Sequence, residues 1–341
     1  MESGKMRSIS LRRNRDKSVD NTKGNCSGMH SLAALYRKEM SDHITSKRFV
    51  IILCLVMAST IAGLYGALSG LSDAISDSSD FIFLKLYTTS GNSIPSYMSF
   101  IGLIGPFVGL IFGFDAINSE RNNGTLNRLL SQPIYRDSVI IGKFLASASV
   151  ISIMVVSTGV LIGAIGFLKT GIHPSGEELV RILVYLVYTI VYICFWLAMS
   201  MLFSVYCKHS STSALASIAL WIFFAIFMSL LASMIANAVY PINDQYHAII
   251  NTMSNYNCEL YLNRISPYYL YSEAVSTILN PSVRTVNVVT MSQMVGAISG
   301  YLSLGQSLLL VWPHLVGMAA LTLAAFTIAY VRFMRQEIRG N

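Results

Sequence analysis

Six long runs of apolar residues constrain this chain more than any other feature of its sequence. They cover approximately Phe49–Leu68, Tyr97–Phe114, Ile140–Leu168, Leu179–Tyr206, Ala214–Tyr240 and Ser307–Phe333. A helix rises 1.5 Å per residue, so about 20 apolar residues cross a hydrocarbon core about 30 Å thick. Inside lipid every backbone polar group must be paired within the protein, which favours helices for runs of this length. The sequence therefore predicts an all-α integral membrane protein with six transmembrane helices.

The distribution of charge predicts the orientation of these helices. Only 12% of the 341 residues are charged, against about 25% in an average soluble domain. Lys and Arg gather before the first span, in the loop after the second span and at the C-terminal end, which are the positions expected on the cytoplasmic side. We therefore expect a multi-pass protein of the plasma membrane with both termini cytoplasmic. The net charge of +7 indicates contact with anionic lipid, and we expect no nucleic-acid partner.

The residues before the first span divide into two parts. Residues 1–28 are basic and rich in Ser and Asn, and we expect a disordered cytosolic tail without a cleavable signal peptide. Residues 29–47 predict an amphipathic helix in the membrane interface, either a simple anchor or a platform for a cytosolic subunit. Its apolar side chains recur every fourth residue, at Leu32, Tyr36, Met40 and Ile44. Residues 48–334 then form one six-span domain, and residues 335–341 a cytosolic C-terminal tail.

The segment between the fifth and sixth spans, residues 241–306, is too long for a simple connection and favours a functional or capping element. Ser266 and Pro267 have the pattern of a helix N-cap followed by proline in the first turn. We expect that helix to end at Asn280 and a second helix to cover Met291–Tyr301. The apolar face of the helix that starts at Pro267 consists of Leu270, Ala274 and Ile278. We expect Tyr268, Tyr269 and Tyr271 of the same helix to lie at the membrane-water boundary.

Glycines recur every fourth residue in two of the spans. They are Gly105, Gly109 and Gly113 in the second span, and Gly159 and Gly163 in the third. Small residues at this spacing let helix backbones approach closely. The stripes predict close helix packing, either within the chain or between two copies of it.

Ionisable side chains are rare inside the apolar runs. We expect Asp115, Lys143 and Arg181 to reach water at the ends of spans, and His314 alone to lie well within a span as a hydrogen-bonded packing residue. A proton or ion pump would need more such groups. The sequence also has no phosphate-binding loop, no paired catalytic motif and no metal-ligand spacing among its five cysteines. We therefore expect a chain that is not an enzyme and has no metal or cofactor of its own.

The loop after the second span, residues 115–138, is the part that points to a function. Residues 115–121 extend the preceding helix, Gly124 interrupts it, and Thr125 can cap a new helix. That helix has an apolar face of Leu126, Leu129 and Leu130 and ends at Pro133. Such a face predicts insertion into a groove of another protein, with an interfacial helix resting on lipid as the alternative.

The loop sequence E-R-x-x-G-T-L…L-L-S-Q-P…R, the helix with Glu39 ahead of the first span, and the R-I-S-P run at Arg264–Pro267 resemble ABC type-2 transporter permeases. The most similar subset is the one related to the permease of nitrous-oxide-reductase maturation. This resemblance implies a permease that pairs with a second copy or a paralogue and couples to separate ATPase subunits, which bind ATP and Mg. We expect it to export an unidentified substrate.

The resemblance also assigns roles to residues. The loop residues that would dock the ATPase are Glu120, Arg121, Gly124, Thr125, Leu126, Leu129, Leu130, Pro133 and Arg136. Those that would lie at an outer gate are Arg264, Ser266, Pro267 and Leu270. An alternative function is a membrane scaffold or assembly factor that recruits a cytosolic partner without transport, and a further one is an intramembrane enzyme.

Overall fold

The computed structural model describes residues 32–77, 81–91, 94–122, 124, 136–241, 248–280 and 302–336. This part of the chain is helical and contains no strand. Six of its helices are long and apolar enough to cross a membrane: Lys47–Leu71, Tyr97–Asn122, Arg136–Thr170, Gly176–Tyr206, Ser210–Val239 and Leu304–Arg335. The predicted all-α fold with six spans is confirmed. The predicted tail at residues 1–28 and the predicted helix at Met291–Tyr301 lie outside the described residues.

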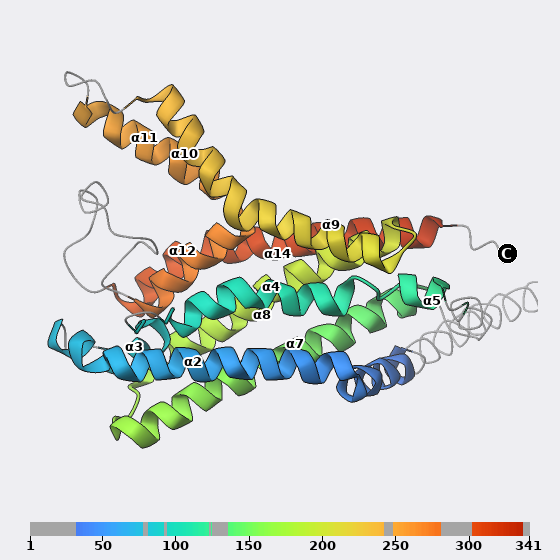
Figure 1. Ribbon diagram of the computed structural model, residues 1–341, viewed down its shortest axis with the longest axis horizontal. Helices are drawn as coiled ribbons and strands as arrows, with labels where there is room; N and C mark the ends of the chain where they lie inside the picture. Colours follow the sequence, from blue (N-terminus) through green and yellow to red (C-terminus); the bar gives the residue numbers. More distant parts are fainter. Residues whose placement is uncertain are drawn as a thin grey trace, which may run out of the picture.

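Apart from α10, the last part of the fifth span, the spans run side by side as one bundle (Figure 1). In chain order they are α2 (Lys47–Asp77), α4 (Tyr97–Gly113), α7 (Arg136–Thr170), α8 (Gly176–Tyr206), the three-part span α9 (Ser210–Ile222), η1 (Phe223–Phe227) and α10 (Met228–Val239), and α14 (Leu304–Arg335). The shorter helices are α3 (Ile82–Thr88), α5 (Asn118–Asn122), α11 (Ala248–Asn263) and α12 (Pro267–Leu279).

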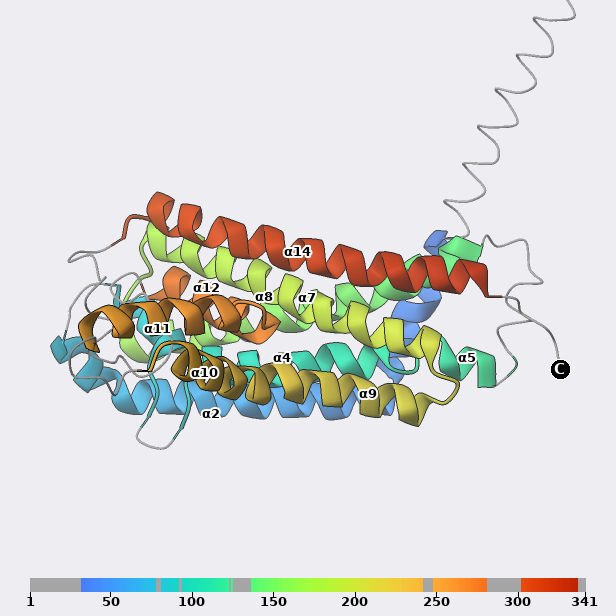
Figure 2. The same cartoon turned by 90° about the horizontal axis from the view of Figure 1, so that it is seen from above.

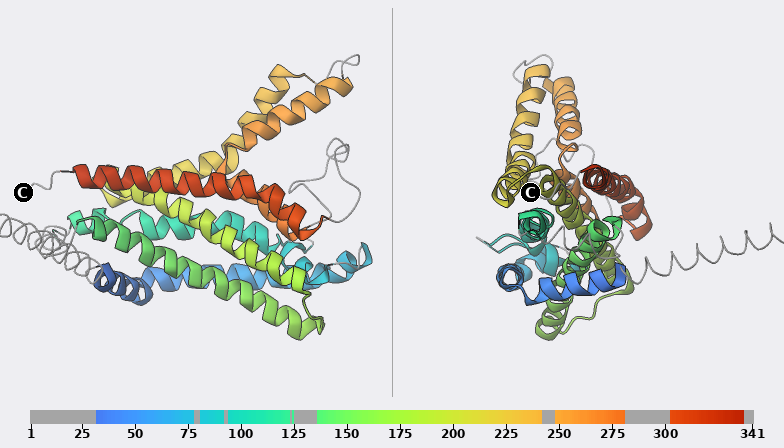
Figure 3. Two further views of the ribbon diagram at one scale, coloured as in Figure 1. Left: turned by 180° about the vertical axis from the view of Figure 1, so that it is seen from behind. Right: turned by 90° about the vertical axis from the view of Figure 1, so that its right-hand side faces the viewer.

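A helix over residues 32–45 precedes α2. The right panel of Figure 3 shows this helix side-on where α2 is seen end-on, so it runs across the end of the bundle. We call this end, which also holds α5 and residue 336, the basal end, and the opposite end, which holds α3, the distal end (Figure 1). The predicted helix before the first span is therefore present, and its location in a membrane interface stays a prediction.

The centre of the bundle is α8, which passes between α14 and α9 (Figure 2). In its most apolar window 67% of the residues are buried, against 11% for the fifth span. The close contact with α4 depends on glycine. A Cβ atom on Gly109 would lie 2.6 Å from the carbonyl oxygen of Ile193, and one on Gly113 would lie 2.8 Å from that of Leu197. The glycine stripe of the second span therefore packs against α8 within the chain.

The glycines of α7 have different surroundings. A Cβ atom on Gly159 would lie 2.6 Å from a methyl carbon of Leu186 in α8, so α7 also packs closely on the central helix. A Cβ atom on Gly163 would lie 3.4 Å from the Tyr87 hydroxyl, an ordinary contact distance. Of these two glycines, only Gly159 lies in a very close contact, and that contact is with the end of the flexible Leu186 side chain, which a small shift relieves.

Replacing Gly109 with alanine tests the packing of α4 on α8. The added methyl group meets backbone atoms that cannot rotate away, so we expect the free energy of unfolding to fall by about 1–3 kcal/mol. Gly317→Ala in α14 is the matched control, because nothing lies within 4 Å of the corresponding Cβ position. Unfolding in mild detergent measures both variants. Equal stability of the two would contradict the close approach of α4 to α8.

The fifth span changes direction at its π-helical turn, η1. A π turn leaves a backbone carbonyl without its regular partner, and the Ser266 hydroxyl donates a hydrogen bond of 2.8 Å to the carbonyl oxygen of Phe224. Beyond this turn α10 leaves the bundle with α11 packed beside it, and α12 then returns alongside α14 (Figure 1). The Ser266 bond therefore fixes the point at which the α10–α11 hairpin meets the bundle.

The return of α12 buries a tyrosine that the sequence placed at the membrane surface. Tyr271 is only 1% exposed, and its ring stacks on that of Tyr192 with centroids 4.1 Å apart. The side chain of Tyr271 fits because Gly102 leaves room for it, since a Cβ there would lie 3.2 Å from the ring. Tyr271 therefore faces the interior of the bundle, because α12 folds back into it, and its depth relative to the membrane surface stays a prediction.

Candidate coupling site

The flanks of the predicted coupling loop meet at the basal end. Of the nine predicted loop residues, the described ones are Glu120, Arg121, Gly124 and Arg136. Those outside the described residues are Thr125, Leu126, Leu129, Leu130 and Pro133. Gly124 has a φ of +68°, a conformation that favours glycine, and it lies two residues beyond Asn122, the last residue of the flank helix α5. The other flank is already helical at Arg136, where α7 begins, so the end of the predicted loop is the first turn of the third span.

A buried ionic cluster joins this loop to helix 32–45. The Lys143 ammonium lies 2.9 Å from the Glu39 carboxylate and 3.3 Å from that of Glu120. Lys38 adds a second positive charge, 3.3 Å from Glu39 and 3.9 Å from Glu120. The side chains of Lys143 and Glu39 are each 7% exposed, and that of Glu120 is 15% exposed. Lys38 is 50% exposed and also lies 3.6 Å from Asp42, so three carboxylates and two ammonium groups come together where α5, α7 and helix 32–45 meet.

The expectation that Lys143 reaches water is therefore wrong. Helix 32–45 crosses the basal end and places Glu39 over the Lys143 ammonium, which replaces water as its partner. A buried charge loses its hydration and needs such ion pairs and hydrogen bonds in return. The cluster consequently specifies how helix 32–45 sits on the loop flank.

Replacing Lys143 with methionine tests this cluster. The carboxylates of Glu39 and Glu120 would lose their best-buried partner, and breaking one side of a buried pair costs about 3–5 kcal/mol. Unfolding measurements in detergent should show this loss, and adding Glu39→Gln to Lys143→Met should recover part of it. The control is Lys169→Met at the exposed distal end of the same helix. If both single variants lost the same stability, the buried pairing would have no special role.

Three further contacts fix the same region. His43 of helix 32–45 lies 3.0 Å from the Ser147 hydroxyl and packs edge-on against Phe112. Burial lowers the pKa of His43, the largest effect on this group, and so disfavours the charged form of its ring. Arg48 at the start of α2 pairs with Asp115. Helix 32–45 and the start of α2 therefore both hold the chain segment that leads into the loop.

The two arginines of the loop flanks contact the end of α14. The Arg121 guanidinium donates a 2.6 Å hydrogen bond to the side-chain oxygen of Gln336. Arg136 donates to the carbonyl oxygens of Phe333 and Gln336, at 3.0 and 2.6 Å. The sequence pattern offered no indication of Gln336, which follows the last span directly and belongs to no motif. Its role emerges only from the fold, which brings together residues 200 and 215 positions apart.

The predicted gate residues lie far from this site, in the segment that re-enters the bundle. Ser266 caps α12 by accepting a hydrogen bond from the Tyr269 amide, and Pro267 is in the first turn as predicted. Arg264 lies in the turn before the helix, and its guanidinium makes a two-pronged contact with Glu273 at 3.0 and 2.6 Å. The Leu270 carbonyl accepts a hydrogen bond from Tyr188 in α8. These contacts hold the start of α12 against the bundle.

His314 of α14 completes a triad with Arg264 and Glu273. Its Nε2 atom lies 3.0 Å from the Glu273 carboxylate, which places this histidine in a hydrogen bond within a span. Glu273 therefore accepts hydrogen bonds from Arg264 and His314 together and joins α12 to α14.

Replacing Glu273 with glutamine tests that junction. The Arg264 and His314 side chains would keep a neutral acceptor but lose the charged one, and a hydrogen bond to a charged group contributes about 1.5–3 kcal/mol. We expect faster amide hydrogen exchange in α12 and no change at the basal end. Glu259→Gln in α11 is the matched control. Unchanged exchange in α12 would show that the triad does not hold this helix.

Arg181 forms a second buried junction near the distal end. Its side chain is 1% exposed, so the expectation that it reaches water is wrong. It donates to Glu177, to the carbonyl oxygens of Ile278 and Leu302, and to the Ser307 hydroxyl, at 2.7–3.0 Å. These acceptors surround it because α12 and the start of α14 close over the end of α8. Arg181 thus links all three helices.

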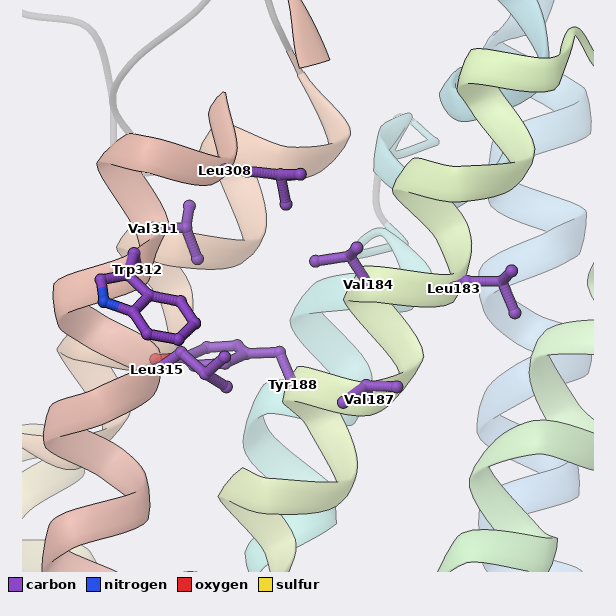
Figure 4. Close-up of a pocket in the computed structure, with 8 residues that line it drawn as sticks. All are labelled: Leu183, Val184, Val187, Tyr188, Leu308, Val311, Trp312 and Leu315. Carbon is purple, nitrogen blue, oxygen red and sulfur yellow. The ribbon is translucent and has the colours of Figure 1, made fainter. Parts of the chain in front are cut away.

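An apolar groove of about 350 Å³ separates α8 from α14 on the basal side of Arg181 (Figure 4). Its lining consists of Leu183, Val184, Val187, Tyr188, Leu308, Val311, Trp312 and Leu315. The Tyr188 hydroxyl is already bonded to the Leu270 carbonyl. Apart from the indole N–H of Trp312, the lining therefore offers only contacts to hydrocarbon. Among the described residues no group of three or more His, Cys, Asp or Glu is placed to hold a metal ion.

These features define a multi-pass helical membrane protein in which the two flanks of one loop are anchored at one end of the bundle. Its sequence matches the ABC-2 family transporter protein profile over residues 33–338, and the chain belongs to this family. The resemblance inferred from the loop is confirmed.

Two relatives carry the name "Probable ABC transporter permease protein NosY". The protein from Stutzerimonas stutzeri is 28% identical over 148 residues, which are 42% of this chain and 49% of that protein. The protein from Pseudomonas aeruginosa is 24% identical over 147 residues, which are 42% of this chain and 52% of that protein. The chain spans about half the length of the curated relatives it matches.

Proposed function

We propose that this chain is the membrane-spanning permease subunit of an ABC transporter that exports its substrate. It pairs with a second copy or a paralogue, and the basal end faces the cytoplasm, where separate ATPase subunits dock on the loop at residues 115–138. The observation that carries the proposal is the anchoring of both loop flanks. Glu120 of the first flank pairs with Lys143, which also pairs with Glu39 of helix 32–45, and both flanks meet Gln336.

This anchoring suits a part that receives force from another protein. A loop that only connected two spans would need no buried ion pairs, whereas a loop that is pushed or pulled must move the helices attached to it. ATP binding in the partner subunits then displaces the flanks as one body with helix 32–45, a rigid-body change of the kind found in switching proteins. The ATPase must bind the two permease states with different affinity for this to work. ATP, Mg and hydrolysis belong to the partner, and this chain has no catalytic role.

Replacing both Leu126 and Leu130 with aspartate tests the docking step. A charged side chain on the apolar face of the loop would have to be desolvated in the partner groove, so we expect loss of the ATPase on co-purification, by about tenfold or more. Leu126→Met with Leu130→Met keeps an apolar face and should retain the partner. Normal binding by the aspartate variant would refute docking through this face.

Reconstitution separates the transporter from the scaffold alternative. The wild-type chain and its co-purified ATPase are placed in liposomes, and hydrolysis is compared with that of the ATPase alone. A permease that changes state with its motor should alter the rate of hydrolysis. An unchanged rate would favour a scaffold that recruits the partner without coupling to it.

A further inference from the structure

We propose that Gln336 is a positioning residue that joins both flanks of the coupling loop to the basal ends of the fourth and sixth spans. This inference rests on the proposed function, because it concerns how movement of the loop enters the bundle. Gln336 is the first residue after α14, and its side-chain oxygen, side-chain nitrogen and backbone carbonyl each make a different contact.

The side-chain amide bridges the first flank and α8. Its oxygen accepts the 2.6 Å hydrogen bond from Arg121, and its nitrogen donates a 2.9 Å hydrogen bond to the Val205 carbonyl oxygen near the end of α8. A guanidinium can only donate and a backbone carbonyl can only accept, so the two partners determine the orientation of the amide. The neighbouring Ser204 hydroxyl also accepts from the amides of Ile117 and Asn118, at 3.1 and 3.2 Å. The end of α8 therefore holds the first flank at two points.

The backbone of Gln336 binds the second flank. Its carbonyl oxygen accepts a 2.6 Å hydrogen bond from Arg136, which also binds the Phe333 carbonyl and lies over the Phe333 ring, 5.3 Å from its centroid. The last carbonyl groups of a helix lack partners within it, and a cation is favoured there by the helix dipole. Arg136 therefore caps α14 from the loop side, and both flanks end on one residue.

The chemistry of this position suits glutamine in particular. The side chain must present an acceptor to Arg121 and a donor to a carbonyl at the same distance from its backbone. Glutamate lacks the donor, lysine lacks the acceptor, and methionine has a similar length with neither. Each contact can therefore be removed by a different substitution.

Movement that enters at Gln336 has a continuous path to the distal end. The helices α8 and α14 pack together, and Arg181 joins them again beyond the apolar groove, through Ser307 of α14 and the Ile278 carbonyl of α12. The pair is thus fastened near both ends, with only apolar contacts lining the groove between. A shift of the loop flanks moves the basal ends of α8 and α14, and Arg181 passes it to α12, the proposed gate helix.

The test uses the full chain with the ATPase that co-purifies with it, in liposomes. Gln336→Met removes both side-chain contacts and keeps the backbone carbonyl. We expect the ATPase to stay bound. The stimulation of ATP hydrolysis by this chain should fall about tenfold, as expected for the loss of a charge-assisted hydrogen bond. The ATP-dependent change of amide hydrogen exchange in α12 should disappear. Gln336→Glu keeps the acceptor for Arg121 and should give an intermediate loss. Gln306→Met is the matched control at the other end of α14, where it removes only the exposed capping hydrogen bond from the Ser303 amide, and we expect full stimulation.

Arg121→Ala removes the same contact from the loop side and leaves α14 intact, so it is the variant to measure if Gln336→Met does not accumulate in the membrane. Adding Arg121→Ala to Gln336→Met should reduce the stimulation of the ATPase little further, because both substitutions remove the same hydrogen bond. If Gln336→Met, or Arg121→Ala in its place, keeps full stimulation and the exchange response, the positioning role is overturned while the permease function stands. If the wild-type chain itself does not stimulate the ATPase, both proposals fail.

Discussion

The burial of Lys143 determines how the basal end of this protein is built. An ammonium group on the inner face of a membrane helix must either reach water or meet carboxylates, and here it meets Glu39 and Glu120 at 2.9 and 3.3 Å. These two carboxylates come from helix 32–45 and from the loop flank, so the charge holds together three elements that are separate in sequence. Such a pair contributes little net stability after desolvation, but breaking it is costly. The ion pairs of Lys143 therefore determine how helix 32–45, α5 and α7 are arranged more than they add to the stability of the fold.

The parts of the fold that could be predicted are those that depend on local sequence. The six spans follow from apolar length, and the start of α12 follows from Ser266 and Pro267, whose capping and proline geometry needs no tertiary information. Lys143, Arg181 and Tyr271 could not be placed in the same way, because what covers a side chain near the end of a span depends on which helix folds over it. Gln336 lay beyond prediction for the same reason. Its partners are Arg121, Arg136 and Val205, and only the fold brings them together.

The spans also differ in how deeply they are buried in the bundle, which affects how they can move. In the most apolar stretch of α8 67% of the residues are buried, against 11% in that of the fifth span. The α10–α11 hairpin leaves the bundle at the π turn. Helix α12 is tied to α14 by the Glu273–His314 contact and to the π turn by Ser266. A shift of α14 therefore acts on α12 directly, whereas the hairpin can change direction at a turn where the regular helical bonds are already interrupted.

Two kinds of contact, polar and apolar, connect α8 to α14. The polar junctions at Gln336 and Arg181 are directional, since each hydrogen bond requires one geometry, and they resist separation of α8 from α14. The apolar groove between them has no such requirement, because dispersion contacts with Leu183, Val187 and Trp312 tolerate sliding and can be exchanged for contacts with lipid tails. A pair of helices fastened in this way tilts as one unit when its basal end is displaced. This property is what a permease driven from the basal end requires, and it follows from where the polar residues of α8 and α14 are placed.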